Sequence, residues 1–469
     1  MTTYILGAGP TGLAIADGLI DSNGGSFVVL ERSQQLGGLA QTVQWQGIGS
    51  HDLGPHKIFS LDRQLVQRIE NLLPSSDWLT HDKVSSVYLK GHYLPYPPSP
   101  FSLAGIFGLP AFVKMVMGYC FAKIGSLLGD KQPSTFAEDL EGRLGAPLYA
   151  ILFKPIAEKL WGDPRELDVK LSKGRVQTPS LAEVIGRLLK IKSSSEFEAL
   201  TFRYPKGGLG RIWDAIAKKS HGKGEICTGV NITGLEVSGR RIVRIHTEGD
   251  NANSAIDIGA DDYVVSSLPM AHTIRLLGNG LPAHIAALAD KVLHFNDLLL
   301  VFLHVDCPSL VKESWVFIPD TAIAFHRLSE QESFDPGMTP NGSIVCCEIM
   351  SSTHRNFAAK SDDELIEVSL KGLADMEYAG FKVLNRKVIR LPRSYPVFRT
   401  GYEAGLKELI TALDGFDNFR SVGRQGAFNY IGTLDAMDIG YGFARWLAGN
   451  RQGAWQEERD RTSHYPVLD

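Results

Sequence analysis

The sequence has few cysteines and no strong charge of either sign. Its 469 residues include five cysteines, and the formal net charge is −4 at pH 7. None of the cysteines forms a C-x-x-C pair. The odd number and the missing spacing argue against a disulfide framework or a metal site, and they predict reduced thiols in a cytoplasmic protein. Without a basic excess, a nucleic-acid partner is not expected.

The sequence also lacks a long uninterrupted apolar run. The most apolar stretch, residues 101–128, is interrupted by Pro110, Lys114 and Lys123. A membrane-spanning helix needs about 20 nearly uninterrupted apolar residues, and a central lysine is costly there. We therefore expect a buried or lid-forming pair of helices, with monotopic membrane contact as the alternative. No signal peptide is expected, because a strand-like run begins by residue 4.

What the sequence does contain is a glycine-rich turn near its start. Residues 4–6 are apolar, residues 7–12 read GAGPTG, and residues 13–20 are helix-like. In G-x-G-x-x-G the first glycine permits a tight turn, the second lets the backbone approach a pyrophosphate, and the third lets the helix pack on the strand. The helix N-terminus favours phosphate. Glu31, nineteen positions after Gly12, can accept hydrogen bonds from ribose hydroxyls.

A second glycine pair follows Glu31 in the run ERSQQLGGLAQT, residues 31–42. This run resembles the pattern of the FAD-dependent amine oxidase and protoporphyrinogen oxidase superfamily, which includes UDP-galactopyranose mutase. The resemblance implies FAD, with NAD a distant second. The cofactor-binding residues that it implies in this part of the chain are Gly7, Gly9, Pro10, Thr11, Gly12, Glu31, Arg32, Gly37, Gly38 and Leu39.

Residues 54–59, GPHKIF, resemble the segment that lies against the flavin ring in the mutases. The resemblance implies that Gly54, Pro55 and His56 contact the cofactor. His56 and Lys57 could place a hydrogen-bond donor or a positive charge beside the flavin, where reduced flavin carries negative charge. The alternative is that His56 caps a turn.

Residues 153–162, FKPIAEKLWG, closely resemble another stretch of this superfamily. In the mutases, the tryptophan at this place and an arginine soon after it face the substrate cleft. The matching residues are Trp161 and Arg175. A core aromatic and a solvated side chain are the plainer interpretations of these two residues.

The last segment resembles the strand and helix that lie under the flavin. The motif V-G-R implies Gly423 and Arg424 beside the cofactor, and Met437 in the following helix as a further contact. Earlier in the chain, Val230 matches a valine that contacts adenine. The mutases carry a tyrosine shortly after the G-R pair, and this place is occupied by Phe428. That departure weakens a mutase assignment.

The sequence predicts an α/β fold, in which a Rossmann-like FAD/NAD(P)-binding domain is interleaved with a helical and antiparallel-sheet substrate domain. The expected segments are 1–92, 201–292 and 391–469 for the FAD domain, 93–200 for a mostly helical region, and 293–390 for the antiparallel sheet.

The leading functional hypothesis is an FAD-dependent oxidoreductase of the protoporphyrinogen oxidase or amine oxidase type. It would transfer hydride from a substrate C–H to flavin N5. The alternative is a mutase-like isomerase that uses reduced FAD on a sugar nucleotide. We expect a small-molecule substrate, and the oligomeric state stays open. No catalytic base is evident, and the catalytic candidates are His56, Lys57, Trp161, Arg175 and Arg424.

Overall fold

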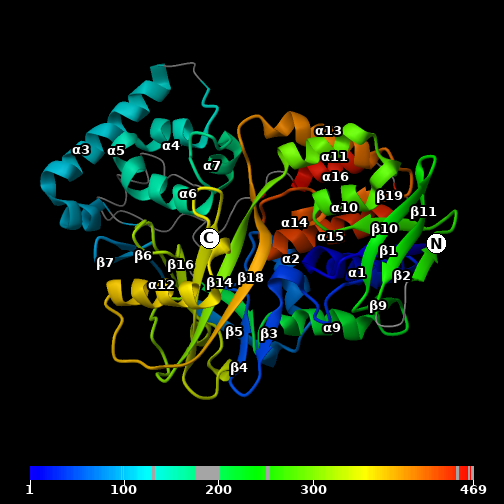
Figure 1. Ribbon diagram of the computed structural model, residues 1–469, viewed down its shortest axis with the longest axis horizontal. Coiled ribbons are helices and arrows are strands. Elements are labelled where there is room, and N and C mark those ends of the chain that lie inside the picture. Colours follow the sequence, from blue (N-terminus) through cyan, green and yellow to red (C-terminus); the bar gives the residue numbers. More distant parts are fainter. Residues whose placement is uncertain are drawn as a thin grey trace.

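The computed structural model describes residues 1–96, 98, 100–128, 132–175, 201–249, 254–449, 451, 454–462 and 465. Figure 1 shows a parallel-sheet region at one end, a helical region at the other, and a large mixed sheet beside both. The chain passes between these regions several times, as the interleaved arrangement predicted.

A five-stranded parallel sheet forms the core of the dinucleotide-binding region. Its strands are short runs of β-branched and aromatic residues, which favour extended backbone. They come from three distant parts of the chain. In sheet order they are β19 (Phe419–Ser421), β13 (Tyr263–Ser266), β1 (Thr2–Leu6), β2 (Ser26–Leu30) and β9 (Glu225–Cys227).

Helix α1 (Pro10–Asp21) connects β1 to β2 and is buried along nearly its whole length. It packs against α15 (Thr433–Ala448), because glycines on both helices allow close approach. A Cβ on Gly18 would lie 2.6 Å from the Ala444 Cβ, and one on Gly440 would lie 2.5 Å from the Thr11 carbonyl oxygen.

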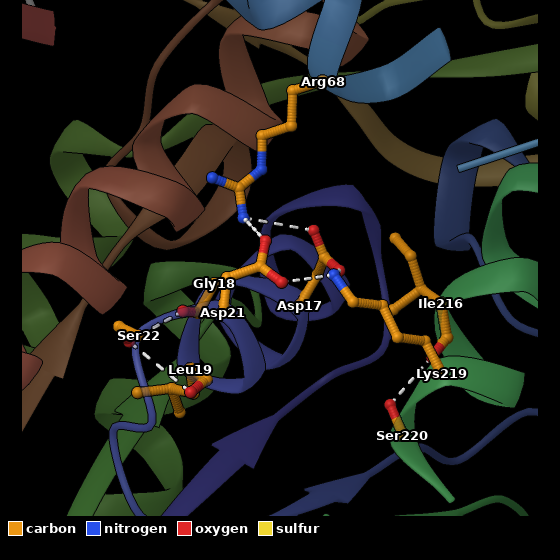
Figure 2. Close-up of polar contacts among 9 residues, drawn as sticks. All are labelled: Asp17, Gly18, Leu19, Asp21, Ser22, Arg68, Ile216, Lys219 and Ser220. Carbon is orange, nitrogen blue, oxygen red and sulfur yellow. Dashed lines mark hydrogen bonds and ion pairs between the residues drawn. The ribbon is translucent and has the colours of Figure 1, made fainter. Parts of the chain in front are cut away.

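Two cations from other helices hold the outer side of α1 (Figure 2). Asp17 is buried, and its carboxylate pairs with Arg68 of α2 (Arg63–Glu70) at 3.3 Å and with Lys219 of α9 (Gly210–Ser220) at 2.6 Å. The more exposed Asp21 pairs with the same two cations, each at 2.6 Å. Three helices are thus joined around one buried carboxylate.

The second large element is a seven-stranded sheet, antiparallel apart from the β15–β6 pair. It includes one strand that lies within residues 1–92, the expected first FAD segment, and a second strand that begins at residue 92. In order the strands are β18 (Val383–Val397), β14 (His294–Val305), β17 (Ser343–Ser351), β16 (Arg327–Glu330), β15 (Trp315–Phe317), β6 (Ser85–Leu89) and β7 (His92–Pro95).

The remaining strands that the structure describes form smaller sheets. They are β10 (Asn231–Ser238) with β11 (Arg241–Glu248) and β12 (Ser254–Asp257), β3 (Thr42–Trp45) with β4 (Gly49–Asp52), and β5 (Trp78–Asp82) with β8 (Thr201–Pro205). The helices around the two regions include α10 (Met270–Leu277), α11 (Ala283–Val292), α12 (Asp362–Asp375), α13 (Tyr402–Asp414), α14 (Gly423–Gly426) and α16 (Trp455–Thr462).

The helical region contains α3 (Pro100–Leu128), α4 (Phe136–Leu144), α5 (Ala146–Leu148), α6 (Lys154–Leu160) and α7 (Val169–Arg175). Helix α3 bends at Gly108, whose φ is +77°, so the expected pair of helical pieces is present. The expectation that this stretch is buried is wrong. Leu109 is 70% exposed and Phe121 is 66% exposed, because only the opposite side of the helix packs on the protein.

Candidate flavin and substrate site

The glycine-rich loop between β1 and α1 has the geometry that its spacing predicts. Gly7 adopts a φ of +96°, which a side chain disfavours. A Cβ on Gly12 would lie 2.0 Å from the Gly7 carbonyl oxygen, so helix and strand pack too closely for any other residue. Gly9 differs, because a Cβ there would meet no atom within 4 Å. This open side of Gly9, at the N-terminus of α1, is where a pyrophosphate fits.

The second glycine pair lies directly on this loop. Gly37 donates its N–H to the Ala8 carbonyl oxygen at 2.9 Å, and a Cβ on Gly38 would lie 3.3 Å from the Gly9 Cα. Both glycines have positive φ, and Leu39 follows in the short turn Gly38–Ala40. The two glycine motifs therefore frame one site, as the resemblance implied.

Glu31 lies at the end of β2, next to the loop. Its Oε2 accepts a hydrogen bond from the Ala8 N–H and its Oε1 accepts one from the Ser33 N–H, both at 2.8 Å. Each carboxylate oxygen can accept further hydrogen bonds, so ribose hydroxyls remain compatible with this position. Val230 donates its N–H to the Glu31 carbonyl oxygen at 2.9 Å, which places it beside the same strand end. The side chain of Arg32 is exposed.

The C-terminal segment meets the loop from the other side. A Cβ on Gly423 would lie 2.5 Å from the Thr11 Oγ1, so Gly423 packs directly on the first turn of α1. The prediction for Met437 is wrong for its side chain. Met437 is fully buried in the hydrophobic core, so it presents no surface to a cofactor. Asp438 also has a structural partner, Arg461, at 2.7 Å.

The segment predicted to lie beside the flavin ring holds a neutral histidine. Gly54 has a φ of +93°, and its carbonyl oxygen accepts a hydrogen bond from His56 Nδ1 at 3.1 Å. Burial, and the nearby charges of Arg327 and Arg424, lower the pKa of His56 to about 4. His56 therefore supplies no positive charge at neutral pH. Because its Nδ1–H is donated to a carbonyl, its Nε2 is a hydrogen-bond acceptor.

Pro55 and Lys57, on either side of His56 in the chain, have different surroundings. Pro55 is half-buried. The Lys57 ammonium lies 5.2 Å from the ring centroid of Trp315, on strand β15. Lys57 therefore contacts the substrate-domain sheet, with a cation–π contact that accounts for its position.

Four residues from separate segments form an aromatic–arginine cluster: Trp161, Tyr395, Arg424 and Tyr430. The Arg424 guanidinium lies 5.4 Å from the Tyr395 ring and 5.2 Å from the Tyr430 ring. The Tyr430 ring meets those of Tyr395 and Trp161 edge to face, with centroids 5.5 Å and 6.1 Å apart. This arrangement brings together two of the predicted catalytic candidates.

Trp161 is a core aromatic residue that also contacts the cluster, and its role at a substrate cleft stays a prediction. Its ring packs on Phe136, with centroids 5.7 Å apart, and it also borders the cluster. Its buried Nε1–H has no hydrogen-bond acceptor among the residues that the structure describes. Arg175 ends helix α7, and its side chain lies outside the described residues.

The sequence alignment that placed Phe428 at the mutase tyrosine is not supported. Phe428 is buried with a φ of +52° and packs against Phe295 and Phe398, with ring centroids 5.1 Å and 5.5 Å away. This left-handed backbone turn directs its ring into the core. Tyr430, two residues later, brings a phenol to the cluster instead.

The sequence analysis missed an ion pair next to the flavin-side segment. Arg327 of β16 and Glu348 of β17 are direct cross-strand neighbours, and two hydrogen bonds of 2.5 and 2.8 Å join them. Glu348 is fully buried, and a Cβ on Gly54 would lie 3.4 Å from its Oε2. A charged residue inside the apolar run of β17 was the signal that could have found it.

The residues present fit a flavin dinucleotide. The open side of Gly9 leaves room for a pyrophosphate, and the buried Trp161 N–H has no acceptor among the described residues, so it is available to a ligand. Glu31 lies beside this glycine-rich loop, and the neutral His56 lies on the segment that was expected beside the flavin ring.

Comparisons with known proteins agree with this geometry. Residues 5–71 match the family model of an NAD(P)-binding Rossmann-like domain. A solved structure of reduced UDP-galactopyranose mutase matches with a TM-score of 0.81 and 19% identity, covering 96% of this chain and 94% of that one.

Two other solved structures match over similar lengths. A putative protoporphyrinogen oxidase from Exiguobacterium sp. 255-15 matches with a TM-score of 0.71 and 15% identity, covering 96% and 99%. A cyclohexylamine oxidase from Brevibacterium oxydans IH-35A matches with a TM-score of 0.66 and 15% identity, also covering 96% and 99%. At these identities the likenesses show a shared fold. The chain thus shares its fold with these three proteins and begins with an NAD(P)-binding Rossmann-like domain.

Proposed function

We propose that the protein is an FAD-dependent enzyme of the mutase type, which isomerises the sugar of a sugar nucleotide without net oxidation. The observation that carries this proposal is the aromatic–arginine cluster beside a neutral histidine. Arg424 and Arg327 both act on His56 electrostatically, and Arg327 pairs with Glu348. The Arg424 guanidinium, which donates hydrogen bonds to the carbonyl oxygens of Ile431 and Ser394, brings a positive charge near His56 that suits an anionic substrate.

The side chains of the aromatic–arginine cluster can donate the hydrogen bonds that a diphosphate and a sugar accept. A guanidinium forms strong, charge-assisted hydrogen bonds with phosphate oxygens, and the Tyr430 hydroxyl can add another. The Trp161 Nε1–H can donate to an oxygen of the same ligand. Contacts with the rings of Tyr395 and Tyr430, and hydrogen bonds to backbone carbonyl oxygens, hold Arg424, so the charge is already positioned before the substrate arrives.

His56 has a different role in this arrangement. Its acceptor Nε2 can take a hydrogen bond from a sugar hydroxyl, while its donated Nδ1–H keeps the ring fixed against Gly54. When bound in its reduced form, FAD supplies a nucleophilic N5 for the sugar C1. The likeness to reduced UDP-galactopyranose mutase, which has the highest TM-score of the three comparisons given above, supports this chemistry over an oxidation.

The test is to incubate the dithionite-reduced protein with a panel of UDP-sugars and to separate the products by chromatography. We expect isomerisation that requires prior reduction but does not consume reductant stoichiometrically. Arg424→Lys should lower kcat/KM by about 10- to 100-fold, because lysine cannot reproduce a stacked, planar donor. Arg390→Lys is the matched control, since Arg390 lies on β18 and pairs with Asp362 at 2.6 Å. No isomerisation of any UDP-sugar by the reduced protein would refute the mutase proposal.

A second candidate is the FAD-dependent oxidoreductase of the protoporphyrinogen oxidase type. Hydride would pass from a substrate C–H to flavin N5, and molecular oxygen or another acceptor would reoxidise the flavin. With its pKa lowered to about 4, His56 is a weak base, which suits a hydride transfer in which the protein removes no proton from the substrate. Anaerobic bleaching of the flavin by a porphyrinogen, with no UDP-sugar turnover, would favour this candidate. The positive charge of Arg424 near His56 disfavours a protonated amine substrate.

A further inference from the structure

Helix α3 carries an outward-facing apolar surface. Its most exposed large apolar side chains are Leu109, Phe121, Ile124 and Met117, at 70%, 66%, 52% and 51% exposure, and Val113 and Val116 are exposed as well. Figure 1 shows α3 at the outer end of the helical region, far from the parallel sheet. Such a surface in contact with water is costly and marks an interaction site.

These side chains lie on one face of the helix. Residues in an α-helix follow each other at about 100° around the axis. Measured from Val113, the exposed apolar residues then fall within an arc of roughly 140°, bounded by Val116 on one side and Phe121 on the other. By the same rule Lys114 and Lys123 lie just beyond the two edges of this arc. Helix α3 contains no acidic residue.

The opposite face of α3 is fixed to the protein. A Cβ on Gly118 would lie 2.7 Å from Pro147 Cδ, and a Cβ on Gly145 would lie 2.4 Å from the Gly118 carbonyl carbon. Met115, on this side of the helix, is buried. The helix is therefore held against α4 and α5 with its apolar arc directed outwards.

We propose that α3 lies flat on the surface of an anionic lipid bilayer, with its apolar arc among the acyl chains and Lys114 and Lys123 at the phosphate headgroups. An apolar arc with lysines along both edges is typical of interfacial helices, because long basic side chains reach the headgroups from the edges. The charge of this helix complements anionic lipid.

Two other ways of covering the apolar arc of α3, by a spanning arrangement or by a second copy of the chain, fit the structure less well. By length and composition Ser102–Ser126 could span a membrane, with a mean hydropathy of 1.6. A spanning helix is surrounded by lipid, however, and the close contacts of Gly118 with α5 exclude lipid from one face. A second copy of the chain, packed symmetrically on this face, would bring lysines of like charge together at its edges.

The experiment is flotation of the FAD-loaded, full-length protein with vesicles of phosphatidylglycerol and phosphatidylcholine, compared with vesicles of phosphatidylcholine alone. We expect binding to the anionic vesicles that weakens as salt is added. Phe121→Glu should lower the partition coefficient by about tenfold or more, since it removes a fully inserted aromatic group. Lys114→Glu with Lys123→Glu should abolish the preference for anionic vesicles.

Leu384→Glu is the matched control, because Leu384 is 50% exposed on strand β18, outside the helical region. It should leave partitioning unchanged. A second measurement uses Phe121→Trp, whose fluorescence should be quenched by brominated acyl chains. Each variant is first checked for bound FAD and an unchanged melting temperature. The proposal is overturned if the wild-type protein does not bind anionic vesicles. It is also overturned if Leu384→Glu weakens binding as much as Phe121→Glu does, or if Phe121→Glu only dissolves a dimer.

Discussion

Thr11 Oγ1 donates a hydrogen bond of 2.9 Å to the carbonyl oxygen of Ala436, 425 positions later in the chain. This bond joins the first turn of α1, which directly follows the Gly7–Gly9 turn, to α15. Gly423 packs on the same threonine. The first and last segments of the chain therefore build a single site, and neither can hold a dinucleotide in this way by itself.

The second and third glycines of the motif, Gly9 and Gly12, should respond differently to an added methyl group. Gly9→Ala should fold with an unfolding free energy within about 1 kcal/mol of the wild type, because nothing lies within 4 Å of its Cβ. It should nonetheless lose FAD, since the methyl occupies the space for the pyrophosphate. Gly12→Ala should cost about 3 kcal/mol, because its Cβ would overlap the Gly7 carbonyl oxygen.

Flavin absorbance per mole of protein and thermal melting of the apoproteins measure these two effects separately. Normal FAD content in Gly9→Ala would mean that the pyrophosphate does not pass Gly9. Equal destabilisation of the two apoproteins would contradict the packing argument.

Removing the buried carboxylate of α1 should be far more damaging than removing its exposed neighbour. Asp17→Asn leaves Arg68 and Lys219 without their buried partner and should cost about 2–3 kcal/mol. Asp21→Asn should cost less than about 1 kcal/mol, because Asp21 is 44% exposed and water screens the pair. Urea unfolding at pH 7 gives both values. A larger loss in Asp21→Asn than in Asp17→Asn would contradict the burial argument.

Substrate binding should depend on Tyr430 and not on Phe428. Tyr430→Phe keeps the ring contacts of the cluster but removes the hydroxyl, and should raise KM about tenfold if the hydroxyl binds a charged phosphate. Phe428→Tyr buries a hydroxyl in the core and should lower the unfolding free energy by about 1–3 kcal/mol with KM unchanged. Steady-state kinetics and urea unfolding on both variants distinguish the two roles. A higher KM in Phe428→Tyr would restore the sequence alignment.

His51 should make the protein sensitive to acid. Burial first, and the charge of Lys387, lower its pKa to about 4, while its backbone hydrogen bond to Asp52 opposes the shift. The unfolded chain binds the proton with a pKa of about 6.5, so the unfolded state gains protons first as the pH falls. The stability is complete above about pH 6.5 and declines towards pH 4, by about 2–3 kcal/mol at pH 4.5.

His51→Phe retains an aromatic ring against Phe302, whose centroid lies 3.8 Å from that of His51. The difference in unfolding free energy between pH 7.5 and pH 4.5 should therefore be smaller in this variant by about the same 2–3 kcal/mol. Comparing variant with wild type cancels the contributions of His56, whose pKa is also lowered, and of Asp52, whose pKa burial raises to about 6. An identical pH dependence in the two proteins would show that His51 titrates normally in the folded state.

The local motifs were readable from the sequence because their function depends on the backbone of a few adjacent residues. Gly7, Gly9 and Gly12 must occur at fixed spacing to make the turn, the open side and the close packing. Charge that interrupts an apolar run is local too, so the sequence favoured a non-spanning helix at residues 101–128. The Rossmann-like domain and the fold of the superfamily were predicted on these grounds.

The tertiary structure decided which side chains meet and which way they face. The sequence could not distinguish Phe428 from Tyr430, because a left-handed turn at Phe428 directs one ring into the core and leaves the next aromatic residue at the cluster. It could not pair Arg327 with Glu348, since strand register sets that contact. The ionisation state of His56 and the exposure of Phe121 depend on burial. Burial results from how distant segments pack, and no local pattern in the sequence contains it.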